Sequence, residues 1–186
     1  STQDKPSISF IGAGNYASRV LIPSFKKLDV NLNTIVSLGG TSAVSHGNRN
    51  GFLSASTSIE KTLSDDSVDA VAIVTRHNNH AELTVKALKA GKHVFVEKPL
   101  AMNMNELKDV QETYNTSKSH LMVGFNRRFA PHIQTIKKLL DNATQPKNFL
   151  MVMNAGEIPS DHWTQDKTIG GGRIIGEACH YIDLMR

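Results

Sequence analysis

Short apolar runs alternate with segments of helical periodicity through the first half of the chain. Each run is long enough for one strand, and helical patterns lie between the runs. This alternation indicates successive βαβ units, and therefore a parallel sheet covered on both faces. The predicted strands are Ile8–Ile11, Leu32–Ser37, Ala70–Thr75, His93–Glu97 and Leu121–Gly124.

Three helices are predicted between these strands. The first spans Tyr16–Lys27 and the third Asn105–Thr116. The second spans Ala81–Ala90 and stops at Gly91, because glycine is favoured where a helix ends in a left-handed conformation. The Ser- and Gly-rich segment Gly39–Ser58 is expected to hold one short helix and a loop.

The rhythm changes after residue 124, where we expect a second domain. A helix is predicted over Pro131–Leu140, an apolar strand over Asn148–Asn154 and a helical pattern over Glu177–Arg186. The last pattern carries no stop signal, so we expect a piece of a longer protein. The predicted fold is α/β: a doubly wound parallel sheet over residues 7–125, then the start of an incomplete α+β domain over residues 126–186.

Composition excludes several classes of protein. The chain has 39% hydrophobic and 20% charged residues, as globular domains do. No apolar run approaches the roughly 20 residues of a membrane-spanning helix, and Ser1–Pro6 lacks the apolar stretch of a secretory signal. We therefore expect a cytoplasmic protein without a membrane partner. The single cysteine, Cys179, excludes an intramolecular disulfide and a multi-cysteine zinc site.

The charge balance is weakly basic, with 21 Lys and Arg against 17 Asp and Glu. The excess is scattered, and only Arg127 with Arg128 and Lys137 with Lys138 form pairs. Because these pairs lack the repeated interleaved aromatic residues of a stacking platform, nucleic acid is not an expected partner.

A glycine motif, G-x-G-x-x-A, joins the first strand to the first helix. Gly12 permits the tight turn, Gly14 lets the backbone approach a pyrophosphate, and the small Ala17 lets the helix pack close to the sheet. An ordinary glycine turn is the alternative. We predict a dinucleotide site formed by Gly12, Ala13, Gly14, Asn15 and Tyr16.

The end of the second strand lacks the acidic residue that NAD-specific domains usually place about 20 residues after the glycines. Ser37, Thr41 and Ser42 are candidates to bind the 2′-hydroxyl of NAD or the 2′-phosphate of NADP. His46 or Arg49 would add positive charge if the loop folds back. The choice between NAD and NADP stays open.

The tripeptide Glu97-Lys98-Pro99 follows the strand at His93–Glu97, at the carboxyl end where open α/β sheets bind ligands. A lysine there can hold a substrate hydroxyl by a charge-assisted hydrogen bond and ease removal of its proton. A solvated strand end is the alternative.

Three polar residues, Glu177, His180 and Asp183, recur every third position on one helix face, after the glycines 170–172. Histidine titrates near neutrality, which suits taking a proton from a carbinol, and Glu177 or Asp183 would orient it. A metal site is disfavoured because no His-x-x-x-His spacing is present. A Cys179–His180 nucleophile pair is disfavoured because adjacent residues on a helix point apart. An ordinary capped surface helix is the alternative to a functional site.

Four motifs in order resemble the signatures of the Gfo/Idh/MocA oxidoreductases. They are Gly12–Ala17, Thr75–Ala81, Ala90–Leu100 and Gly124–Phe129. The stretch 170–183 is similar to the segment that carries the catalytic histidine of that family. The resemblance implies a Rossmann domain, NAD or NADP as the cofactor, and hydride transfer to or from a sugar, cyclitol or nucleotide-sugar carbinol.

The same resemblance implies roles for single residues. Lys98 and His180 would be catalytic, with His180 as the acid/base. The loop residues Thr75, Arg76, His77 and His80 would lie along the cofactor, although they could instead cap the following helix. The implied cofactor contacts also include Ser37, Glu97 and Lys98, and the implied substrate contacts are Arg127, Trp163, Glu177 and Asp183.

Members of this family carry a large open sheet after the catalytic helix, and this chain stops at Arg186. Its closing motif resembles the C-terminal half of two-domain proteins with an alcohol-dehydrogenase-like domain, so Ser1–Pro6 would be a linker end. We expect a homo-oligomer acting on a polyhydroxylated small molecule. The rival reading is a non-catalytic dinucleotide-binding sensor or assembly module, which would need the glycine turn but neither Lys98 nor His180.

Overall fold

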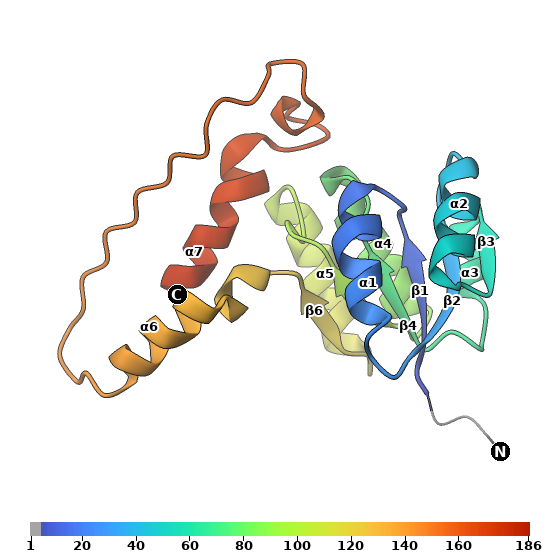
Figure 1. Cartoon of the computed structure of the whole chain (residues 1–186), viewed down its shortest axis with the longest axis horizontal. Coiled ribbons are helices and arrows are strands. Elements are labelled where there is room, and N and C mark those ends of the chain that lie inside the picture. The colour runs from blue at the N-terminus through green and yellow to red at the C-terminus, as the bar shows by residue number, and fades with distance from the viewer. Residues whose placement is uncertain (1–4) are drawn as a thin grey trace. The chain divides into compact units, whose positions relative to one another are not determined.

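The first of two compact units is a six-stranded parallel sheet. The computed structural model describes residues 5–186 and divides the chain between Val123 and Gly124. The strand order is β3-β2-β1-β4-β5-β6 (Figure 1), with every neighbouring pair parallel. The order reverses between β1 and β4, so the predicted doubly wound sheet is confirmed. The strands are β1 (Ser7–Ile11), β2 (Asn31–Val36), β3 (Ser54–Ser56), β4 (Ala70–Ile73), β5 (His93–Val96) and β6 (Leu121–Val123).

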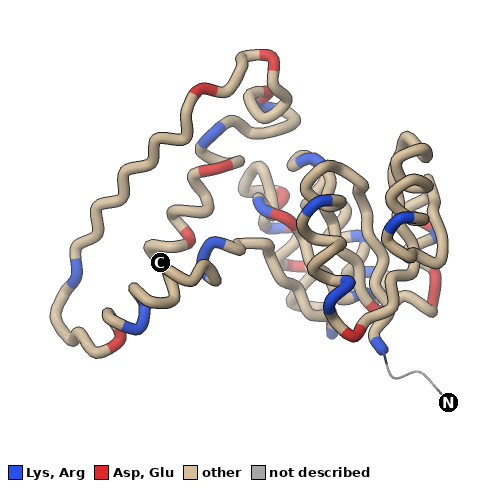
Figure 2. The backbone as a smooth tube through the Cα atoms, viewed as in Figure 1, with Lys and Arg blue, Asp and Glu red and all other residues tan. Residues whose placement is uncertain are grey.

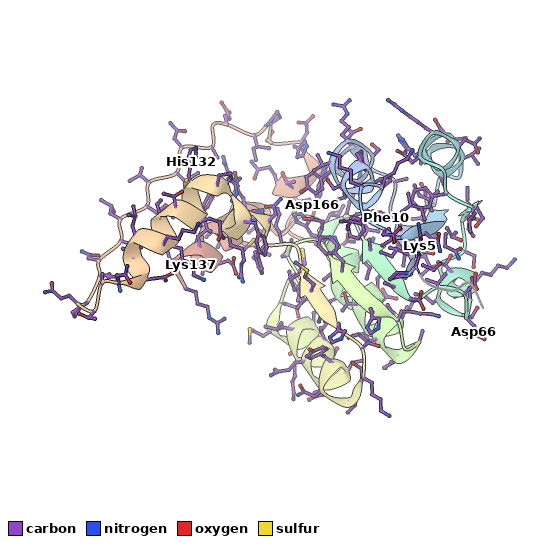
Figure 3. The ribbon with its side chains drawn as sticks, turned by 60° about the horizontal axis from the view of Figure 1, so that its bottom comes forward. Lys5, Phe10, Asp66, His132, Lys137 and Asp166 are labelled. Atoms are coloured by element: carbon purple, nitrogen blue, oxygen red, sulfur yellow. The ribbon has the colours of Figure 1, made fainter. Side chains whose placement is uncertain are left out.

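Helices cover both faces of this sheet. One face holds a core around Phe10 (labelled in Figure 3), to which Ile22 and Ala43 contribute from the helices after β1 and β2. The opposite face packs Leu63 and Leu88 from the helices after β3 and β4. The helical elements are η1 (Ala17–Leu21, a π-helical turn), α1 (Ile22–Phe25), α2 (Thr41–Asn50), α3 (Ile59–Leu63), η2 (His77–Asn79), α4 (His80–Lys89) and α5 (Met104–Thr116).

The segment 39–58 contains more structure than the sequence predicted. Besides the expected short helix, α2, it forms the edge strand β3, which pairs with β2 in parallel. The hydroxyl oxygens of Thr34 on β2 and Ser54 on β3 lie 2.7 Å apart. Because β3 is short, polar and at the edge of the sheet, it carries none of the apolar pattern that marks a buried strand.

The second unit consists of helices and extended chain, with no strand among its residues 124–186. The predicted strand over 148–154 is therefore wrong for this structure. That segment runs as a long open chain (Figure 1), and Leu150 and Val152 are 91% and 81% exposed. A strand needs a hydrogen-bonding neighbour, which residues 124–186 do not supply. The helical elements are η3 (Asn126–Phe129), α6 (Pro131–Asp141), η4 (Trp163–Gln165), η5 (Ile174–Ala178, π-helical) and α7 (Cys179–Met185).

Charged residues of both signs are interspersed along the backbone of each unit (Figure 2). Within residues 5–186, no helix is long and apolar enough to cross a bilayer. Most of the predicted linker end, Ser1–Pro6, lies outside the described residues.

Candidate active site

The turn after β1 needs glycine at one position for the fold itself. Gly12 has φ +113°, and a Cβ atom added there would lie 2.6 Å from the carbonyl oxygen of Val74. The Gly12 N–H also donates to the carbonyl oxygen of Val36, at 2.9 Å. The chain therefore passes between the ends of β2 and β4 with no room for a side chain.

Gly14 is different, because nothing in the described protein requires a glycine there. Its φ lies outside the left-handed region, and an added Cβ would meet no atom within 4 Å. The Gly14 carbonyl accepts the first helical hydrogen bond, from the Ser18 N–H at 3.0 Å, so open space borders the start of a helix. A helix N-terminus with bare backbone is suited to a phosphate group. The pyrophosphate of a dinucleotide fits this geometry, with the buried Ala17 holding the helix close to the sheet.

The loop after β4 is fastened to the loop after β5 by His80. The imidazole is fully buried, with Nδ1 2.7 Å from the Pro99 carbonyl oxygen and Nε2 3.1 Å from the Thr75 carbonyl oxygen. Burial lowers the pKa of His80, and the charge of Lys98 lowers it further. The predicted contact between His80 and the cofactor does not match this burial, since the ring has no exposed surface. His80 is better described as a support for the two loops.

The other residues of the loop after β4 differ in exposure. His77 is also buried, with its ring centroid 5.8 Å from that of His80. Arg76 is exposed, and the Thr75 hydroxyl donates to the Arg76 carbonyl oxygen at 3.2 Å. Thr75 and Arg76 therefore offer more polar surface to a ligand than the two histidines do.

Glu97 and Lys98 leave β5 at the same edge of the sheet. The Glu97 N–H donates to the Ile73 carbonyl oxygen at 2.9 Å, which continues the pairing of β4 with β5. Burial raises the pKa of the Glu97 carboxyl group, and the charge of Lys98 opposes this effect. Because β2, β1, β4 and β5 are adjacent, their carboxyl ends bring Ser37, the glycine turn, Thr75 and Lys98 to one edge.

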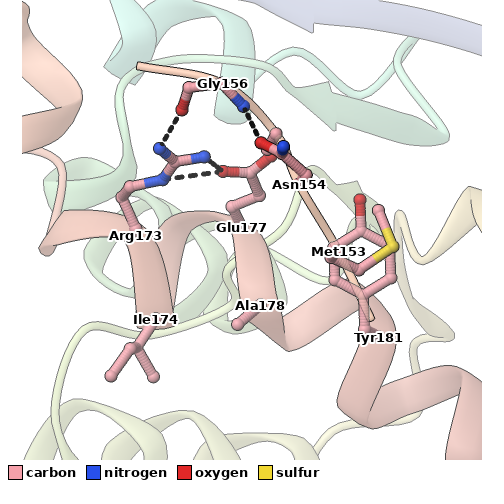
Figure 4. Close-up of a pocket in the computed structure, with 9 residues that line it drawn as sticks. Met153, Asn154, Gly156, Arg173, Ile174, Glu177, Ala178 and Tyr181 are labelled. Carbon is pink, nitrogen blue, oxygen red and sulfur yellow. Dashed lines mark hydrogen bonds and ion pairs between the residues drawn. The ribbon is translucent and has the colours of Figure 1, made fainter. Parts of the chain in front are cut away.

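In the second unit, the two predicted substrate carboxylates are each paired with an arginine. Glu177 accepts from the Nη2 and Nε atoms of Arg173, at 2.9 and 3.2 Å, and Arg173 Nη1 donates to the Gly156 carbonyl oxygen (Figure 4). Asp183 on α7 accepts from Arg128 of η3. Neither arginine was predicted from the sequence as a carboxylate partner. The i,i+4 spacing of Arg173 and Glu177 was a usable signal, whereas 55 residues separate Arg128 from Asp183.

His180 lies on the same helix and is 8% exposed. Its ring meets Phe125 edge to face, with centroids 6.1 Å apart. The guanidinium of Arg127 lies 4.9 Å from the ring centroid of Tyr181, so Arg127 packs on the residue next to His180. Trp163, in η4, is half-buried beside His162.

A cavity of about 350 Å³ borders this helix (Figure 4). Its lining includes Asn154, Arg173, Glu177 and Tyr181. The sequence suggested that Gly170 allows close approach to a ligand. In the structure the fold itself requires glycine there, because an added Cβ would lie 2.4 Å from the Thr164 Cα. Among residues 5–186, no three His, Cys, Asp or Glu side chains come together to hold a metal ion.

A doubly wound parallel sheet with a glycine turn after its first strand defines the Rossmann class of dinucleotide-binding domains. Residues 7–125 match the family model for GFO_IDH_MocA, described as an oxidoreductase family with an NAD-binding Rossmann fold. The chain belongs to this family, which confirms the resemblance seen in its motifs.

Known relatives are longer than this chain. It is 31% identical to myo-inositol 2-dehydrogenase of Thermotoga maritima over 67% of this chain and 37% of that protein. It is 29% identical to oxidoreductase P35 of Formosa agariphila over 94% of this chain and 58% of that protein. A levoglucosan dehydrogenase solved with NADH and levoglucosan has the same fold, with a TM-score of 0.83 at 23% identity over 98% of this chain and 53% of that one.

Proposed function

We propose that this chain is the cofactor-binding part of an NAD(P)-dependent oxidoreductase that acts on CH–OH groups. It would transfer a hydride between a nicotinamide cofactor and a sugar, cyclitol or nucleotide-sugar carbinol. One observation carries the proposal. The open backbone at Gly14 follows β1 and Lys98 follows β5, and β4 joins these two strands in one parallel sheet, so both residues lie at its carboxyl edge. The names of the relatives, inositol and levoglucosan dehydrogenases, support the substrate class.

Residues 7–125 form the cofactor domain in this proposal, and residues 126–186 begin the substrate domain. The bound nicotinamide supplies the hydride acceptor. Lys98 donates a hydrogen bond to the carbinol oxygen and stabilises the negative charge that develops there. His180 takes the hydroxyl proton as the C–H bond gives up its hydride, and a carbonyl group results. In the reverse direction, His180 returns the proton.

The remaining site residues have supporting roles in the proposal. Arg127 and Trp163 would shape the substrate side. Glu177 and Asp183, held by their arginines, would offer carboxylate oxygens to substrate hydroxyls. Carboxylates held in fixed positions suit a polyhydroxylated substrate because they accept hydrogen bonds from it.

Three statements about the whole protein belong to the same proposal. It would be cytoplasmic, it would be a homo-oligomer, and it would carry an alcohol-dehydrogenase-like domain. The exposed apolar side chains of Phe149, Leu150 and Val152 support association, because such a row in open chain is poorly suited to water.

Calorimetry on the 186-residue chain tests cofactor binding, and oxidation of a panel of cyclitols and sugars by the full native protein tests turnover. We expect Lys98→Ala and His180→Ala to abolish most turnover. Lys118→Ala is the matched control, because Lys118 is exposed and precedes β6, at the opposite edge of the sheet. Full turnover by both site variants would contradict the roles proposed for Lys98 and His180. A parent protein that binds the cofactor but oxidises none of the panel would favour the non-catalytic sensor.

A further inference from the structure

We infer that the carboxyl end of β2 accepts the 2′-phosphate of NADP, so that this chain binds NADP(H) at least as tightly as NAD(H). The inference rests on the proposed function and names the residue that sets its cofactor preference, Ser37. Domains that prefer NAD place a carboxylate at this strand end, where it binds the ribose hydroxyls and repels a phosphate.

No carboxylate belongs to the β2 end. The chain contains no Asp or Glu between Asp29 and Glu60. Asp29 precedes β2, at the opposite edge of the sheet, and pairs with Lys5 at 2.5 Å. Glu60 lies in the first turn of α3, which packs through Leu63 on the other face of the sheet from α2. The segment from β2 to the end of β3 therefore contains no acidic side chain that would repel a phosphate.

Two hydroxyl groups take the place of the missing acid. Ser37 follows β2 directly, and its Oγ lies 2.8 Å from the Oγ of Ser42 in the first turn of α2. The Ser37 N–H donates to the Ser56 carbonyl oxygen at 3.1 Å, which fixes the residue beside β3. Both serines are half-buried, so part of each remains accessible. Hydroxyl groups can donate to phosphate oxygens as well as accept from a ribose hydroxyl, whereas a carboxylate can only accept.

The structure also limits the strength of the preference. The sequence allowed His46 or Arg49 to reach the ribose if the loop folded back. Both instead lie within α2, and Arg49 is in its last turn, about 10 Å along the helix axis from Ser42. Without an arginine fork at the strand end, we expect NADPH to bind between equally and about tenfold more tightly than NADH.

Isothermal titration calorimetry with NADH and NADPH separately, on the 186-residue chain, tests the inference. Ser37→Asp restores the missing carboxylate and should weaken NADPH binding at least tenfold, while NADH binding is kept or improved. Ser42→Asp is a second variant that preserves the helix, because an acid in the first turn is favourable there. Ser64→Asp is the control: Ser64 is exposed and follows α3, at the opposite edge, so both affinities should stay unchanged.

The outcomes separate the inference from the proposed function. A parent chain that binds NADH more tightly than NADPH would overturn the inference alone. An unchanged NADPH-to-NADH ratio in both Ser37→Asp and Ser42→Asp would also overturn it. Failure of the parent to bind either nucleotide would overturn the proposed function and the inference together.

Discussion

The two glycines of the turn after β1 should respond to substitution in opposite ways. Gly12 has φ +113°, and an added methyl group would lie 2.6 Å from the Val74 carbonyl oxygen. A side chain in a strained backbone conformation costs about 1–3 kcal/mol, and overpacking costs about 1–3 kcal/mol more. Gly12→Ala should therefore lower the free energy of unfolding by about 2–6 kcal/mol, a large share of the roughly 5–15 kcal/mol of a typical domain.

Gly14→Ala should leave the free energy of unfolding within about 1 kcal/mol of the parent. Alanine is a poorer N-cap residue than glycine, which lowers the free energy of unfolding, but alanine also reduces the entropy of the unfolded chain, which raises it. These two effects offset each other. The added methyl group would stand in the open space that a pyrophosphate needs. Losing one charge-assisted hydrogen bond costs about 1.5–3 kcal/mol, which corresponds to roughly 10- to 150-fold weaker cofactor binding.

Two measurements separate these effects. Urea unfolding should be followed by far-ultraviolet circular dichroism, because the single tryptophan, Trp163, lies in the second unit and does not report on the first. Calorimetry with the better-bound reduced nucleotide then compares Gly14→Ala with the parent. Parent-like affinity in Gly14→Ala would refute the assignment of the open space to the cofactor. Unfolding of Gly14→Ala as early as Gly12→Ala would refute the claim that only Gly12 serves the fold.

Three further predictions concern buried or paired charges. Lys92→Met should lower the free energy of unfolding in urea by about 1–3 kcal/mol, because the buried Lys92 Nζ donates to two backbone carbonyl oxygens at 2.7 and 2.8 Å. Lys89→Met, at an exposed position, is the control, and equal stability of both variants would contradict the prediction. The lowered pKa of His80 means that the folded chain takes up this proton less readily than the unfolded chain. The stability that His80 contributes to the fold is therefore complete above pH 6.5. Below that pH it decreases by at most about 1.4 kcal/mol per pH unit. An equal loss of stability in acid by His80→Gln would contradict this prediction. A double-mutant cycle with Arg128→Ala and Asp183→Asn should give a coupling of about 1 kcal/mol in thermal unfolding, since the Arg128 side chain is half-exposed; zero coupling would show that the pair adds nothing.

The parts of the fold that could be predicted depend on contacts close in sequence. The glycine turn and the stop of α4 before Gly91 follow from the backbone freedom of single residues, and the apolar strands follow from their own composition. β3 could not be predicted, because Ser54, Ala55 and Ser56 gain their strand conformation from pairing with β2. Its polar residues are tolerated because the strand lies at the sheet edge.

In the candidate site, too, the predictable features are those that depend on contacts close in sequence. Ser37, Gly14, Thr75 and Lys98 could be placed at one edge from sequence, because each follows a predicted strand and parallel strands share their carboxyl edge. The role of His80 could not be predicted, since one of its partners is a carbonyl 19 residues away in the loop after β5.

The apolar segment 148–154 shows why a local pattern does not by itself form a strand. Its apolar residues predict β structure as strongly as those of β5 do, yet β5 has neighbours on both sides, whereas residues 124–186 give this segment none. Helix hydrogen bonds close within one segment, but strand hydrogen bonds always belong to two. For that reason the helix η5–α7 forms within this unit and holds Glu177 and His180 on one continuous element, while the segment 148–154 remains open chain. The acid/base residue of the proposed reaction thus lies on an element that does not depend on strand pairing for its backbone hydrogen bonds.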